Sequence, residues 1–136
     1  LAGVRLGLAL APEHLIAEMM KVKDSYNVSM LTQRIGEAAL QDQQHMRSNV
    51  EKICQTRQRL LKELGRLGCD VLPSQANFLF AAPPVQPAER VLSALRDKGM
   101  LVRHFPGELT GRYLRITIGT DEQTDCLLQA FREILA

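Results

Sequence analysis

The first third of the chain combines one alternating run with two helical patterns. Apolar residues alternate with small or basic ones from Val4 to Leu10, and this period of two predicts a β strand. Pro12 suits the first turn of a helix that we expect to end near residues 21–23. Ser29 is suited to cap a second helix reaching about Leu40. The pattern therefore predicts a strand followed by two helices.

A long apolar stripe comes next. Its members recur at intervals of three, four or seven residues, which predicts one long amphipathic helix. They are Met46, Val50, Ile53, Leu60, Leu64 and Leu67. Gly65 and Gly68 favour the end of a helix at this point. We place the main structural boundary near Gly68.

The remainder alternates between short strands and helices. Strands are expected over residues 69–72, 76–81, 100–104 and 113–118, and a helix over residues 87–98. Thr120 and Gln123 have the spacing of a capping box for a last helix, which is expected to bury Leu127, Leu128, Phe131 and Leu135. This order predicts a small α+β domain with helices on one face of a sheet.

Composition excludes several classes of protein. The 136 residues include 17 basic and 15 acidic side chains, a balance that argues against binding driven by nucleic-acid phosphates. No apolar run has the roughly 18 residues that a membrane span needs. Cys54, Cys69 and Cys126 lack zinc spacing and are expected to be buried, reduced thiols of a cytosolic protein, and no metal site is predicted. The chain opens on Leu1 directly in a strand pattern, so we expect a piece of a longer protein.

Three arginines are candidate anion sites. Arg5 lies on a strand face otherwise made of glycine and alanine, which a phosphate or carboxylate could approach closely. Arg115 projects from a predicted strand whose other face, with Leu114 and Ile116, belongs to the core. Arg103 ends the preceding strand, so both arginines would converge on one anion if the strands pair. Each of the three could equally be an ordinary solvated arginine.

Two asparagines are weaker candidates. Asn27, in the break between two helices, could offer its amide to a ligand, and so could Asn77 at the start of a strand. Both could instead only shape their turns. No Ser-His-Asp set, paired carboxylates or phosphate-binding glycine loop is visible. The residues alone therefore lead to an α/β fragment with possible anion sites.

Four segments, in order, resemble one enzyme family. Residues 1–7 (LAGVRLG) are similar to the segment after the Schiff-base lysine of fold-type I pyridoxal-phosphate aminotransferases, and residues 26–28 (YNV) to the segment before the long helix. Residues 74–78 (SQANF) resemble a small-domain strand of that family. Residues 101–103 with 113–120 (YLRITIGT) resemble the closing region of the histidinol-phosphate branch. Because these matches cover the whole chain in the right order, membership of this family is a specific hypothesis.

The resemblance implies roles for particular residues. Arg5 would bind the phosphate of pyridoxal 5'-phosphate, and Arg115, supported by Arg103, would grip the anionic end of the substrate. Asn27 is taken as a further substrate-binding residue. The Schiff-base lysine would lie upstream of Leu1, so no catalytic residue is assigned and this chain alone should be inactive. Residues 1–40 would be a remnant of the large cofactor domain, 41–68 the connecting helix and 69–136 the small domain.

The implied reaction is amino transfer between histidinol phosphate and 2-oxoglutarate in histidine biosynthesis. The resemblance also implies glutamate as the matching amino donor, a homodimer and a cytoplasmic location. Ser25 and Leu8 depart from the residues usual in the family, which leaves the substrate open. The alternatives are an amino-acid aminotransferase, a threonine-phosphate decarboxylase, or a non-catalytic domain that keeps the fold.

Overall fold

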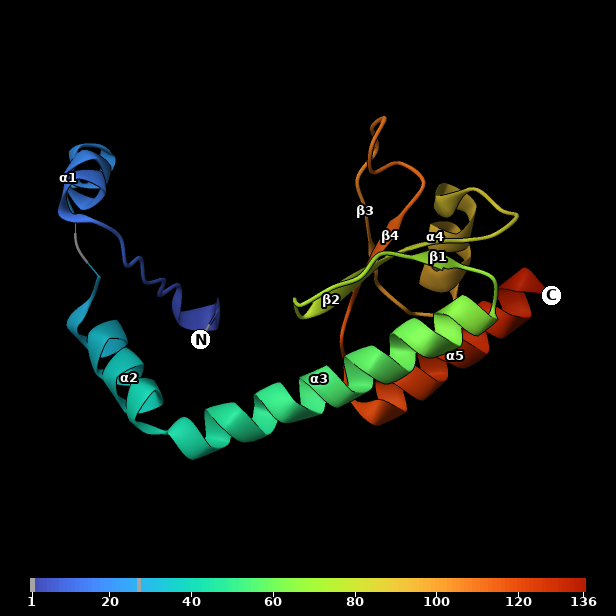
Figure 1. The fold of residues 1–136 in the computed structure, drawn as a ribbon, viewed down its shortest axis with the longest axis horizontal. Helices are drawn as coiled ribbons and strands as arrows, with labels where there is room; N and C mark the ends of the chain where they lie inside the picture. Colours follow the sequence, from blue (N-terminus) through green and yellow to red (C-terminus); the bar gives the residue numbers. More distant parts are fainter. Residues whose placement is uncertain (1, 27) are drawn as a thin grey trace. The chain divides into compact units, whose positions relative to one another are not determined.

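The computed structural model describes residues 2–26 and 28–136 of the chain. These residues form two compact units, 1–47 and 48–136, which divide inside a long helix. Figure 1 shows the chain in colours that follow the sequence. The three-part division expected from the sequence concerns the intact protein, and it stays a prediction.

The first unit is helical, and the strand expected over residues 4–10 is wrong. A 3₁₀ helix, η1, covers Ala2–Val4, and Arg5 turns the chain with a left-handed φ of 56°. The residues that follow form no strand. The physical reason is that an alternating pattern yields a strand only where another strand pairs with it, and the described part of this unit contains none.

Two predicted helices of the first unit are confirmed. Helix α1 spans Glu13–Val22 directly after Pro12, and α2 spans Met30–Gln41. The Ser29 hydroxyl caps α2 by accepting a hydrogen bond from the Thr32 amide at 3.2 Å. Gly36 in α2 is buried because the Leu6 side chain lies against it, where a β-carbon would collide.

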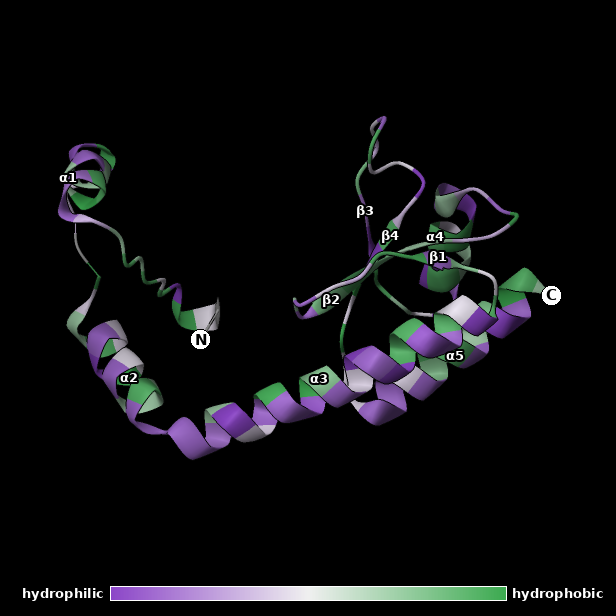
Figure 2. Cartoon of the chain, viewed as in Figure 1, coloured by the Kyte–Doolittle hydropathy of each residue, from purple (hydrophilic) through white to green (hydrophobic). Residues whose placement is uncertain are grey.

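Helix α3 spans Gln43–Arg66, as the apolar stripe predicts. Its first turns are exposed and mostly hydrophilic, with purple predominating in Figure 2, and the stripe members Met46 and Val50 are exposed there. Leu60 and Leu64, nearer its end, are fully buried. After Arg66 the chain turns at Gly68, whose φ of 83° is left-handed, while the Cys69 amide donates to the Leu64 carbonyl.

The second unit contains the predicted four-stranded sheet. Its strands are β1 (Asp70–Val71), β2 (Phe78–Ala82), β3 (Arg103–His104) and β4 (Leu114–Thr117). All neighbours are antiparallel in the order β1-β2-β4-β3. Helix α4 spans Ala88–Asp97 and α5 spans Asp121–Leu135. The α+β class expected for this part is confirmed.

The core lies on one face of this sheet. Alternate residues of β2 and β4 are buried there, and they pack with side chains from α3, α4 and α5. The sheet contributes Leu79, Ala81, Leu114 and Ile116, and the helices contribute Leu60, Leu64, Val91, Leu95, Leu128 and Phe131. With one face occupied by helices, the opposite face is free to carry chemistry.

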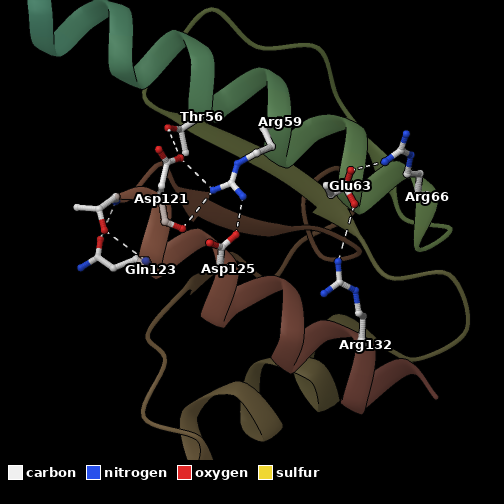
Figure 3. Close-up of polar contacts among 9 residues, drawn as sticks. Thr56, Arg59, Glu63, Arg66, Asp121, Gln123, Asp125 and Arg132 are labelled. Atoms are coloured by element: carbon white, nitrogen blue, oxygen red, sulfur yellow. Dashed lines mark hydrogen bonds and ion pairs between the residues drawn. The ribbon is translucent and has the colours of Figure 1, made fainter.

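Polar contacts join α3 to α5, which lie side by side (Figure 1, Figure 3). The Thr56 hydroxyl donates to the Asp121 carboxylate at 3.1 Å, and Arg59 donates to Asp121 and to Asp125. The hydrogen bond to Asp125 is the main factor that raises the pKa of Arg59. Exposed ion pairs each contribute little, so these contacts fix the register of two helices whose packing comes from the core.

Candidate functional site

The second face of the sheet gathers aromatic and basic side chains. Arg115 on β4 pairs in register with Phe80 of β2 on one side and with Arg103 of β3 on the other. Residues directly opposite in a ladder project from the same face, with β-carbons about 4.5–5.5 Å apart. Phe80, Arg115 and Arg103 therefore form one row across three strands, on the face away from the helices.

Neither arginine of this row is neutralised within the described residues. Arg103 and Arg115 make no hydrogen bond or ion pair there and instead contact rings. The Arg115 guanidinium carbon lies 4.1 Å from the centre of the Phe78 ring, and that of Arg103 lies 5.7 Å from the Phe105 ring. Two like charges opposite each other repel. An anion placed between them would relieve that repulsion.

A third arginine nearby has a different environment. Arg112 donates to the Asp70 carboxylate at 2.6 Å, and the Tyr113 hydroxyl donates to the same oxygen at 3.3 Å. The charge of Arg112 is therefore already paired. Among the described residues, Arg103 and Arg115 thus differ from Arg112 in having no acidic partner.

The connection between β3 and β4 is held by its own hydrogen bonds. The His104 ring nitrogen Nε2 lies 2.7 Å from the Gly111 carbonyl oxygen, and the Thr110 hydroxyl donates to the Phe105 carbonyl. The Gly111 amide also donates to the Gly107 carbonyl. These contacts fix the backbone beside Arg103. No role is predicted from the sequence for His104, whose side chain is largely buried.

Arg57 is a second residue whose structural role was not predicted from the sequence. Its side chain is buried, donates to the Ala76 carbonyl at 2.9 Å, and has a buried Nε with no partner among the described residues. The Ser74 hydroxyl donates to the Phe78 carbonyl at 2.7 Å in the same segment. A signal was available, because Arg57 interrupts the apolar stripe between Ile53 and Leu60. Its effect is to hold the segment that leads into β2.

Arg5, the remaining candidate, lies in the first unit. Its side chain is exposed and forms no ion pair within residues 2–26 and 28–136. The left-handed backbone at Arg5 is uncommon for a residue with a β-carbon, and such strain is often stored at functional sites. Asn27 lies outside the described residues, and the side chain of Asn77 is exposed while its carbonyl accepts from the Ile118 amide.

Other kinds of site find no support in the described part of the chain. No group of three or more His, Cys, Asp or Glu side chains there could hold a metal ion. Burial raises the pKa of the Cys69 thiol to about 11, so this cysteine is not a nucleophile at neutral pH. No helix among these residues is both long and apolar enough to cross a membrane.

Comparison with known proteins identifies the family. The family model for class I and II aminotransferases matches residues 1–131. The chain belongs to this aminotransferase family. The histidinol-phosphate aminotransferase of Synechocystis sp. is 47% identical over 134 residues, which are 98% of this chain and 38% of that relative. The aminotransferase chain thus spans well under half the length of the curated relatives it matches.

Solved structures agree with this family. An aminotransferase structure from Erwinia carotovora atroseptica superposes with a TM-score of 0.86 at 28% identity, covering 98% of this chain and 38% of that one. The histidinol-phosphate aminotransferase of Sinorhizobium meliloti, solved with pyridoxal-5'-phosphate, gives a TM-score of 0.76 at 25% identity over 87% of this chain and 33% of that one. The mixed α/β fold predicted for this part of a fold-type I aminotransferase is confirmed.

Proposed function

We propose that the protein containing this chain is a histidinol-phosphate:2-oxoglutarate aminotransferase of histidine biosynthesis. The observation that carries the proposal is the pairing of Arg103 with Arg115 in the ladder between β3 and β4. Two unpaired guanidinium groups side by side suit a doubly charged phosphate, because each can donate a fork of hydrogen bonds to its oxygens. Arg115 would grip the substrate phosphate and Arg103 would support it.

We further propose that Arg5 binds the phosphate of pyridoxal 5'-phosphate. The donor chemistry fits, because Arg5 is an exposed guanidinium without an acidic partner in the described residues. When bound, this cofactor supplies an electron sink for the carbon that carries the amine. The lysine that joins the cofactor in this family is proposed to lie outside residues 1–136, so this part alone is proposed to be inactive. Asn27 is kept as a proposed substrate-binding residue.

The contribution of this part to the reaction is orientation. By fixing the anionic end of the substrate, Arg115 and Arg103 would hold the amine at a constant position and reduce the entropy lost on reaching the reactive geometry. Because both arginines project from paired strands, the separation of their Cα atoms is set by the backbone. Glutamate and 2-oxoglutarate, as smaller carboxylates, would use the same cations. A cytoplasmic homodimer is proposed on the family resemblance.

The test uses the intact protein and two donors that differ only in the phosphate. We expect purified protein to be yellow and to transfer the amine of histidinol phosphate to 2-oxoglutarate. Histidinol, which lacks the phosphate, should react with a much lower kcat/KM. Borohydride should fix the cofactor to a lysine outside residues 1–136. A colourless protein would contradict the enzyme hypothesis and favour a non-catalytic domain, and a yellow protein that ignores the phosphate would favour another aminotransferase.

A further inference from the structure

The guanidinium group of Arg115 lies over the ring of Phe78. The guanidinium carbon lies 4.1 Å from the ring centre, a close cation–π contact between neighbouring strands β2 and β4. Phe78 is only partly buried, although it belongs to the strand that supplies the core residues Leu79 and Ala81. The ring is therefore placed on the cationic face and away from the core.

The chemistry of this support differs from that of an ion pair. Arg112 is held by the carboxylate of Asp70, which neutralises it. A benzene ring carries no net charge, so Phe78 can hold Arg115 in place while leaving its positive charge available to a ligand. Such a contact also restricts a long side chain before binding, which lowers the entropy lost when an anion arrives.

The position of the Phe78 ring is itself fixed. Phe80 meets it edge-on, with ring centres 5.7 Å apart and planes at 87°. The Phe78 carbonyl accepts from the Ser74 hydroxyl, and the preceding Ala76 carbonyl accepts from the buried Arg57. Both the ring and the backbone that carries it are thus held independently of Arg115.

We propose that Phe78 is a positioning residue, which orients the anion-binding guanidinium of Arg115 through its uncharged ring face. The inference rests on the proposed function for the identity of the substrate. Phe78 would act on the anion only through Arg115.

The experiment compares variants of the intact holoprotein. Phe78→Leu removes the ring face, and we expect KM for histidinol phosphate to rise about fivefold, equivalent to about 1 kcal/mol, while kcat is nearly unchanged. Phe78→Tyr keeps a ring face and should stay close to the parent. Phe131→Leu is the matched control, since Phe131 is fully buried in the core. It should lower the melting temperature without changing KM.

A second pair of measurements tests the route of action. Because Phe78 is proposed to act through Arg115, adding Phe78→Leu to the Arg115→Met variant should change KM no further. Binding of inorganic phosphate to the holoprotein, followed by calorimetry, should weaken about fivefold in Phe78→Leu and depend on Arg115. This readout needs no turnover. An Arg115-dependent phosphate site in a protein without histidinol-phosphate activity would therefore reject the proposed function and keep the inference.

Three outcomes would overturn the inference. The first is an unchanged KM and phosphate affinity in Phe78→Leu. The second is an equal effect of Phe78→Leu with and without Arg115, because the ring would then act elsewhere. The third is an equal rise of KM in Phe131→Leu, because the effect would then follow general loss of stability.

Discussion

At the scale of single residues, the partner of each arginine decides what its charge can do. Arg112 is paired with Asp70, while Arg103 and Arg115 rest against the rings of Phe105 and Phe78. Only the latter two therefore keep their full attraction for an anion. A count of arginines in the sequence cannot make this distinction, because it depends on which side chains the fold brings together.

Arg115→Ala tests that distinction. The variant should raise KM for histidinol phosphate strongly, at a cost of about 2–5 kcal/mol, which is typical of losing one member of a charge pair. Cofactor absorbance should be unchanged. Arg112→Ala is the control, because its charge is already paired, and its KM should match the parent. Equal kinetics in Arg115→Ala and the parent would count against the site.

Cys69 provides a test of pH dependence. Burial raises its pKa to about 11, whereas the pKa of an unfolded cysteine is about 8.5. A raised pKa means that the neutral thiol is favoured in the folded state. The stability that this burial contributes is complete below the unfolded pKa and is lost as pH rises toward 11. In the native intact protein, alkylation at Cys69 should stay slow until pH approaches 11.

The control for this thiol is Cys126, which is exposed. The burial expected for all three cysteines is therefore wrong for Cys126, and Cys54 is only partly buried. Replacing Cys126 with alanine should remove a fast-reacting thiol at pH 8, and Cys69→Ala should remove none until denaturant is added. Rapid labelling of Cys69 in the native protein at pH 8 would show that the thiol is accessible.

At the scale of elements, periodicity predicted the helices and the four strands of the second unit. Their burial patterns are local, so alternation and the 3.6-residue period were sufficient. The run over residues 4–10 failed because alternation cannot reveal whether a partner strand exists. The site was harder: Arg103 and Arg115 meet only through the register of β3 and β4. The contact of Phe78 with Arg115 likewise depends on the pairing of β2 with β4.

The start of α5 allows a quantitative test of one such local signal. The Thr120 hydroxyl accepts from the Gln123 amide, and the Gln123 side chain accepts from the Thr120 amide. Thr120→Ala removes the first of these bonds and should lower the free energy of unfolding by about 1 kcal/mol. Thr120→Ser keeps the hydroxyl and should be close to neutral. Denaturant titration of the intact protein compares the three, and equal midpoints would mean that the cap does not limit stability.

At the scale of the whole molecule, the two proposed anion sites belong to different compact units. Arg5 lies within residues 1–47, whereas Arg103 and Arg115 lie within residues 48–136. Each unit has its own internal contacts. The two sites therefore have separate readouts, which are cofactor retention for Arg5 and KM for Arg115.

Arg5→Ala tests the proposed cofactor site. Losing a charge-assisted hydrogen bond costs about 1.5–3 kcal/mol, so the cofactor should dissociate about ten- to a hundredfold more readily. Dialysis of the intact protein followed by absorbance measures that loss. Arg34→Ala is the matched control in the same unit, because Arg34 is exposed and already paired with Glu37. Retention equal to that of the parent would refute the role of Arg5.

The antiparallel ladder between β3 and β4 has a consequence for how this enzyme family can diverge. Since backbone pairing keeps the two cations opposite each other, insertions and deletions at the tip of the intervening loop can accumulate without separating them. A slip of one residue within β3 is a different event, because it would turn Arg103 toward the helices and bury an uncompensated charge. Natural variation should therefore be tolerated in the tip and purged from the paired residues.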